Sequence, residues 1–189
     1  MECAAKFLQK RRVRLGHLFA VVVLVFARPR LEFLIAGTAI ALAGEAVRIA
    51  SAGYILKDKQ LSIAGPYAFT RNPLYVGSFF MYLGFCVAAS NVYVAAAFPP
   101  FFFVVYYATI LREEAYLKET FGADYKKFCS EVPRFFPRPR RPASSGADAG
   151  GGFSFAQASK NKEYEAVIAV AVILGALWIM YLLKWHLIK

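Results

Sequence analysis

The stretch NPLYVGSFFMYLGFCVAASNVYVAAAFPPFFFVVYYATIL, residues 72–111, contains no charged side chain. A helix needs about 20 consecutive apolar residues to cross the hydrocarbon core of a bilayer, and this stretch is about twice as long. Ser90 and Asn91 interrupt it in the middle, and so short a link indicates an antiparallel pair of helices at 74–89 and 92–111. The stretch therefore predicts a membrane hairpin with one crossing and one return.

Three further apolar segments extend this pattern, and we expect a membrane span in each: residues 15–27, 31–50 and 164–183. The first, LGHLFAVVVLVFA, is short and ends in Val-Phe-Ala, so a signal peptide with a small-residue cleavage site is the alternative there. The composition agrees with a membrane protein, because 59% of the residues are hydrophobic and 16% are aromatic. The sequence thus predicts an all-α fold, a polytopic helical membrane protein with about five transmembrane helices.

Small residues and prolines inside the spans indicate how the helices pack. Two pairs of small residues in 31–50 have the four-residue spacing that lets helix backbones approach closely in lipid: Gly37 with Ala41, and Ala39 with Ala43. Pro99 and Pro100 should kink the span at 92–111, because proline removes a helix hydrogen bond.

Glu45 and Arg48 lie three residues apart near the end of the span at 31–50. Side chains with this spacing share a helix face, so we expect a salt bridge at the membrane boundary. The alternative is that Arg48 contacts an anionic ligand, because ionisable groups at this depth are often functional.

The chain becomes polar after residue 111. Four apolar residues recur at helical spacing opposite charged side chains, which predicts a cytosolic interfacial helix lying against the membrane: Leu117, Phe121, Tyr125 and Phe128. Residues 138–163 are rich in Gly, Ala, Ser and Pro and are typical of a flexible linker. The linker would separate the domain at 1–137 from a C-terminal transmembrane helix at 164–189.

Basic residues predict which ends of the spans face the cytoplasm. Lys and Arg residues flank the loop after the second span and follow the fourth span, whereas the turn at Ser90 and Asn91 is uncharged. The positive-inside rule then makes both basic regions and the N-terminus cytoplasmic, and the C-terminus external. Arg28 and Arg30 oppose this orientation but are outnumbered.

Cysteine usage and charge distribution narrow the function classes. Three distant cysteines and two histidines predict neither a disulfide framework nor a metal site. The net charge is +11, but the basic residues cluster at the ends of the apolar segments, where they would meet anionic headgroups. We expect membrane contact and no nucleic-acid partner.

Two polar blocks should meet at the cytoplasmic mouth of the hairpin: GPYAFTRNPLYVG at 65–77 and LREEAYLKETFG at 111–122. Asn72 and Pro73 are typical of a helix start, with Asn72 as the N-cap. Glu113 is four residues before Leu117 and so extends the apolar stripe, which predicts that at least one of the carboxylates of Glu113 and Glu114 points inward and needs a partner.

These blocks, together with ADYKKFCSEVPRFFP at 123–137, resemble the isoprenylcysteine carboxyl methyltransferase and phospholipid methyltransferase family of integral membrane enzymes. The resemblance covers about residues 45–137 and makes 1–137 a methyltransferase-like domain. It implies S-adenosylmethionine as cofactor, bound at the cytosolic side, and a lipid-like acceptor that enters from the bilayer.

Position by position, the resemblance implies a cofactor site formed by Gly65, Pro66, Tyr67, Arg71, Asn72, Glu113 and Glu114. Arg71 with Asn72 would border both cofactor and acceptor. Asn72 departs from the Arg-His-Pro of members that act on isoprenylcysteine, which leaves the acceptor open. For a carboxylate acceptor Arg71 could hold its oxygens, and for an amine acceptor Glu113, Glu114 or Tyr75 could take the proton.

Two other functions compete with methyl transfer. An NADPH-dependent membrane reductase of the sterol reductase type resembles the chain in F-G-x-x-Y and VPRFFP, but it would need a basic pocket for the 2′-phosphate. A non-enzymatic membrane scaffold would bind neither cofactor tightly. The sequence predicts no oligomeric state.

Overall fold

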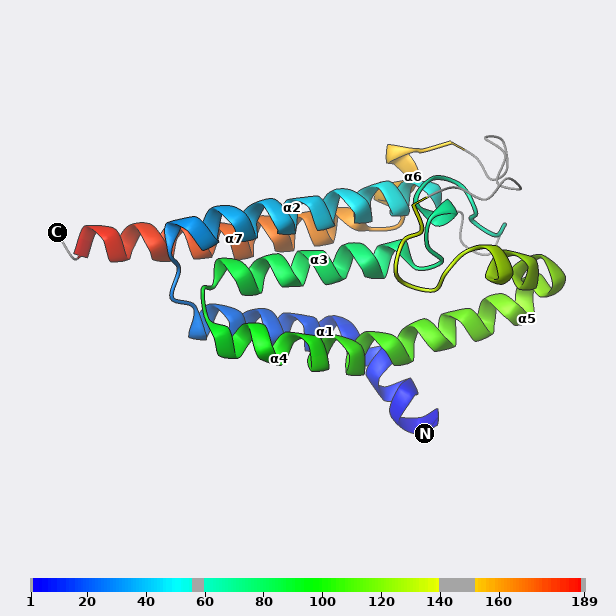
Figure 1. Cartoon of the computed structure of the whole chain (residues 1–189), viewed down its shortest axis with the longest axis horizontal. Coiled ribbons are helices and arrows are strands. Elements are labelled where there is room, and N and C mark those ends of the chain that lie inside the picture. Colours follow the sequence, from blue (N-terminus) through cyan, green and yellow to red (C-terminus); the bar gives the residue numbers. More distant parts are fainter. Residues whose placement is uncertain (1, 56–59, 140–151, 188–189) are drawn as a thin grey trace.

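The computed structural model describes residues 2–55, 60–139 and 152–187, and in these residues the regular elements are helices. The elements are α1 (Glu2–Phe26), α2 (Leu31–Tyr54), η1 (Gly65–Ala68), α3 (Pro73–Ala88), α4 (Val92–Phe102), η2 (Phe103–Tyr107), α5 (Ala108–Glu131), α6 (Phe155–Lys160) and α7 (Glu163–Leu187). Figure 1 shows α1, α2, α3, α4 and α7 running along the long axis of one bundle. The all-α prediction is confirmed.

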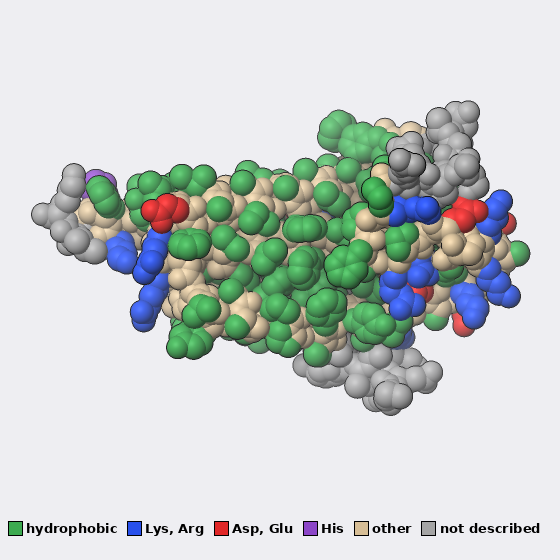
Figure 2. Space-filling model, viewed as in Figure 1, with side chains coloured by type: hydrophobic (Ala, Val, Ile, Leu, Met, Phe, Trp, Pro, Cys, Tyr) green, Lys and Arg blue, Asp and Glu red, His purple; other side chains and the backbone are tan. Residues whose placement is uncertain are grey.

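Three of the five predicted spans lie in helices that are long and apolar enough to cross a membrane: Leu31–Tyr54, Val92–Glu131 and Glu163–His186. The other two lie in shorter apolar helices, Arg14–Phe26 and Pro73–Ala88. Figure 2 shows hydrophobic side chains over the middle of the bundle and charged side chains gathered at its two ends. This distribution is typical of a helical membrane protein.

Helix α1 is part of the bundle core. Phe19 and Val23 are buried, and the Phe19 ring stacks on Phe101 of α4 with the centroids 4.3 Å apart. Such packing favours a membrane span over the alternative of a signal peptide for residues 15–27.

Helices α2 and α3 pack backbone against backbone. A Cβ atom at Gly37 would lie 2.3 Å from the amide nitrogen of Ala88, and one at Gly84 would lie 2.4 Å from that of Ala41. The predicted close approach at Gly37 and Ala41 is therefore confirmed. The pair Ala39 and Ala43 was wrongly included, because both residues are exposed on the other side of the helix.

The helix that contains Pro99 and Pro100 continues through both prolines. Its irregularity follows them, in the π-helical turn η2 at Phe103–Tyr107. The helical run extends from Val92 to Glu131, so the predicted interfacial helix is continuous with the fourth span. A second break occurs at Gly122, whose φ of 47° and ψ of −111° are conformations that glycine adopts readily.

The apolar face of α5 covers protein as well. Tyr125 and Phe128 form a buried cluster with Tyr67 of η1 and Val132, and Leu117 and Phe121 pack at its edge. The periodicity correctly predicted one apolar face. The sequence predicted that this face lies on the membrane. It did not predict that the face also packs against the loop that precedes α3.

Part of the predicted linker at 138–163 is helical. Helix α6 packs near the end of α2, where Asn161 donates hydrogen bonds to the carbonyls of Ala52 and Ile55 at 2.8 and 3.1 Å. Residues 140–151 of that linker lie outside the described residues. Helix α7 then packs along α2, and Trp178 Nε1 donates to Thr38 Oγ1 at 3.2 Å.

Candidate functional site

The GPY turn, residues 65–67, lies at one side of the candidate site. Gly65 has a φ of +58°, and a Cβ atom there would lie 2.4 Å from the Tyr54 ring, so both the backbone and the close approach require glycine. Pro66 occupies the first turn of η1, and Tyr67 is buried against Tyr125 and Phe128. The predicted residues of this turn thus shape the loop through backbone and packing.

Backbone hydrogen bonds join the turn to the segment after α5. The amide of Arg71 donates to the carbonyl of Pro133 at 2.9 Å, and the amide of Arg138 donates to that of Phe69 at 3.0 Å. The Thr70 hydroxyl donates to the Phe135 carbonyl at 3.0 Å. These bonds bring the VPRFFP segment beside the start of α3, although about sixty residues separate them in sequence.

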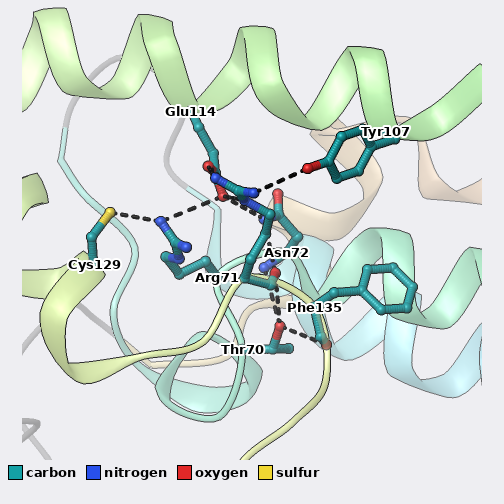
Figure 3. A network of polar contacts seen from close by, with 8 residues as sticks. Thr70, Arg71, Asn72, Tyr107, Glu114, Cys129 and Phe135 are labelled. Atoms are coloured by element: carbon teal, nitrogen blue, oxygen red, sulfur yellow. Dashed lines mark hydrogen bonds and ion pairs between the residues drawn. The ribbon is translucent and has the colours of Figure 1, made fainter. Parts of the chain in front are cut away.

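Glu114 is the centre of the polar network in Figure 3. Its carboxylate is buried and accepts hydrogen bonds from Arg134 Nε at 3.0 and 3.1 Å, with Arg134 Nη2 at 2.9 Å. Asn72 Nδ2 donates to the same carboxylate at 3.2 Å, and Arg71 Nη1 lies 3.5 Å away. Three segments of the chain therefore meet at one carboxylate.

Asn72 precedes α3, but its side chain does not cap the helix. The amide group donates to Glu114 and, at 3.0 Å, to the Arg134 carbonyl. The sequence correctly predicted Asn72 as the N-cap residue, but its side chain does not make the hydrogen bond to the helix amides that an N-cap usually makes. A buried carboxylate that needs donors draws the side chain away from the helix amides.

Arg71 faces the interior of the site. Its Nη1 donates to Cys129 Sγ at 2.7 Å, and its buried Nε has no hydrogen-bond acceptor among the described residues. The buried Tyr125 hydroxyl shares Cys129 as its hydrogen-bond partner. A buried donor without an acceptor, such as Arg71 Nε, is a suitable place for an oxygen atom of a ligand.

Tyr75 and Glu113 form a second pair. The Tyr75 hydroxyl donates to Glu113 Oε1 at 2.8 Å, and the Tyr75 ring contacts Tyr106 with the centroids 5.8 Å apart. Glu113 is half-buried and Glu114 is buried, so at least one of the two carboxylates points inward, as the sequence predicts. A tyrosine beside a carboxylate can hold or transfer a proton.

Burial, hydrogen bonding and nearby charges raise the pKa values of Arg134 and Tyr67. The hydrogen bond with Glu114 raises the pKa of Arg134 above its ordinary value. Burial raises the pKa of Tyr67 well above its ordinary range, and the nearby Glu113 carboxylate adds to this rise. Arg134 therefore stays cationic and Tyr67 stays a neutral hydroxyl at any physiological pH.

The structure thus brings Arg71, Asn72 and Glu114 together, and places Tyr75 with Glu113 beside them. Sequence reasoning missed the roles of Arg134, Thr70, Tyr107 and Cys129 in the network of Figure 3. Arg134 lies in VPRFFP, a motif recognised in the sequence without a role for its arginine. The other three carried no recognisable signal.

In the described ranges, no group of three or more His, Cys, Asp or Glu side chains is placed to hold a metal ion. The absence of a metal site stays a prediction.

Comparison with known proteins places this site in a family. The chain is 35% identical over 81 residues to the protein-S-isoprenylcysteine O-methyltransferase of Schizosaccharomyces pombe. These 81 residues cover 43% of this chain and 34% of that protein. The chain is also 32% identical over 82 residues to the cobalt-zinc-cadmium resistance protein CzcN of Cupriavidus metallidurans, with 43% and 38% coverage.

The chain spans little more than a third of the length of these relatives. No solved structure matches it. Residues 30–124, about half of the chain, match the phospholipid methyltransferase family, and this range includes the GPY turn, Arg71, Asn72, Glu113 and Glu114. The chain therefore belongs to the phospholipid methyltransferase family.

Proposed function

We propose that this protein transfers a methyl group from S-adenosylmethionine to a lipid-like acceptor at the cytosolic face of a membrane. The observation that carries the proposal is the network at Glu114, which joins the RNP block, the EE pair and VPRFFP in a chain of this family. Family membership favours methyl transfer over the reductase and the scaffold as alternatives.

The residues present fit the proposed cofactor. S-adenosylmethionine would supply an electrophilic methyl group on a positively charged sulfonium. Glu113 and Glu114 offer carboxylates at the mouth of the bundle, and Arg71 Nε offers a buried donor that has no acceptor among the described residues. Gly65, Pro66, Tyr67 and Asn72 would complete the walls of this cofactor site.

The chain's own task in such a reaction is alignment and exclusion of water, because methyl transfer is an in-line displacement. The fixed contacts of Glu114 with Arg134 and Asn72 hold the site rigid before a ligand binds. For an amine acceptor, Glu113 would take the proton with Tyr75 as its hydrogen-bonded partner. For a carboxylate acceptor no base is needed, and Arg71 would hold its oxygens.

Calorimetry on detergent-solubilised protein tests this proposal. We expect S-adenosylhomocysteine to bind with micromolar affinity, and NADPH to bind far more weakly. Glu114→Gln should weaken binding at least tenfold, because it removes a charge-assisted contact worth about 1.5–3 kcal/mol.

Glu119→Gln, on the exposed face of the same helix, is the matched control and should bind like the wild type. Transfer of labelled methyl groups to amine and carboxylate lipids then identifies the acceptor. Tight NADPH binding, or no binding of either cofactor, would refute the proposed activity.

A further inference from the structure

A second ionic cluster lies where α2, α3 and α7 meet, apart from the network at Glu114. Arg48 Nη2 lies 2.8 Å from Glu163 Oε1, and Arg48 Nε lies 3.5 Å from Glu45 Oε2. Arg48 Nη1 donates to the Ser78 hydroxyl. The predicted Glu45–Arg48 pair is thus confirmed, and Glu163 joins it from the C-terminal helix, outside the family match at 30–124.

The charges of this cluster do not balance. Two carboxylates, Glu45 and Glu163, face one guanidinium. Glu45 is only 4% exposed, and neither of its oxygens accepts a hydrogen bond from a described residue. Burying a carboxylate without full compensation is costly, so one more positive charge beside Glu45 would stabilise the cluster.

The cluster adjoins the proposed methyl-transfer site along α3. Arg48 of the cluster donates to the Ser78 hydroxyl, and Ser78 lies three residues, about one helical turn, after Tyr75 of that site. A ligand in that site could therefore extend one end to Glu45 and Glu163.

We propose that Glu45 and Glu163 bind an organic ammonium group of a ligand in the methyl-transfer site. The proposal rests on the proposed function. An ammonium group is compact and has three donors, which suits the two Glu45 oxygens and the Glu163 carboxylate.

Such an ammonium could come from two sources: the amino-acid end of the methyl donor, or the head group of an amine acceptor. Two ligand pairs distinguish them. The first is S-adenosylhomocysteine and its deaminated analogue, in which hydrogen replaces the amino group. The second is dodecylammonium and dodecanol, which share a chain and differ in charge.

The experiment measures the binding of all four ligands to wild-type protein and to Glu45→Gln. In the variant the neutral Arg48–Glu163 pair remains, so it should fold with unchanged or higher thermal stability. We expect affinity for one of the two ammonium ligands to fall about tenfold or more, and affinity for its uncharged counterpart to stay unchanged. The pair that responds identifies the source of the ammonium.

Glu32→Gln is the matched control, because Glu32 lies exposed on the same helix, and it should change no affinity. If Glu45→Gln does not fold, the wild type alone decides: it must bind an ammonium ligand at least tenfold more tightly than the uncharged counterpart. Equal affinities within both pairs, or no effect of Glu45→Gln, would overturn the inference. Absence of S-adenosylhomocysteine binding would instead refute the proposed function, and the dodecylammonium pair would then decide the inference by itself.

Discussion

Arg134 is the residue that holds the candidate site together. Its Nε and Nη2 both contact the Glu114 carboxylate, and its backbone carbonyl accepts a hydrogen bond from Asn72 Nδ2. Its Nη1 also donates to the Tyr107 hydroxyl at 3.3 Å, so this one residue connects the start of α3, η2 and α5. A planar guanidinium can make these parallel contacts, whereas an ammonium group cannot.

At this scale we predict that Arg134→Lys weakens S-adenosylhomocysteine binding about tenfold or more, although the charge is kept. Isothermal titration of the folded variant measures the loss. Lys126→Arg, a change between the same residue types on the exposed face of α5, is the control and should bind normally. Full binding by Arg134→Lys would show that only the charge matters.

The close pair of helices α2 and α3 is the element on which the site depends, because α3 presents Asn72 and Tyr75. A Cβ atom at Gly84 would lie 2.4 Å from the Ala41 amide nitrogen and 2.5 Å from the Gly37 carbonyl oxygen. These are backbone atoms, which cannot move aside as a flexible side chain can.

We therefore expect Gly84→Ala to lower the stability by about 1–3 kcal/mol, measured by thermal or denaturant unfolding in detergent. Gly175→Ala in α7 is the matched control, because nothing lies within 4 Å of its added Cβ atom. The control should be neutral or slightly stabilising. Equal effects of the two changes would contradict the tight α2–α3 contact.

The π-helical turn η2 accommodates one extra residue between α4 and α5. Tyr106 and Glu113 both point to Tyr75, while Tyr107 and Glu114 both point to Arg134. A π turn contains about one residue more than an α turn. Deleting one residue there should convert it to regular α-helix without turning the flanking helices relative to each other.

We predict that deletion of Val104, which is exposed, preserves cofactor binding, whereas an alanine inserted after Leu111 abolishes it. The insertion rotates Glu113 and Glu114 by about 100° away from their partners. Titration with S-adenosylhomocysteine compares the two variants. If the deletion is as damaging as the insertion, η2 has a role other than register.

For the whole molecule, the candidate site lies at one end of the bundle, where α2 ends and α3 begins, and the turn at Ser90 and Asn91 lies at the other (Figure 1). The apolar band between the two ends would lie in the membrane (Figure 2). The positive-inside rule predicts that the site end is cytosolic.

Membrane-impermeant thiol labelling of intact cells tests this orientation. We expect Tyr93→Cys, beside the external turn and 82% exposed, to react from outside. Lys127→Cys on α5 should react only after the cells are opened. The opposite pattern would invert the topology, and the unchanged protein measures the background from its own cysteines.

The fold class could be predicted from the sequence because lipid requires helices whose apolar length matches the bilayer. Residues 92–111 and 164–183 satisfied that requirement without reference to any other part of the chain. The meeting of Arg71 and Asn72 with the EE pair also followed, since a hairpin returns its two ends to one side. Local pattern and membrane thickness were sufficient for these conclusions.

Tertiary structure alone decided which carboxylate is buried and what binds it. The apolar stripe through Leu117 predicted that at least one carboxylate of the EE pair points inward, and Glu114 is the more buried of the two because Arg134 reaches it from the segment after α5. The contact of Glu163 with Arg48 likewise joins helices more than a hundred residues apart. Partners at such separations depend on how whole helices pack, and no periodicity within a single helix contains that information.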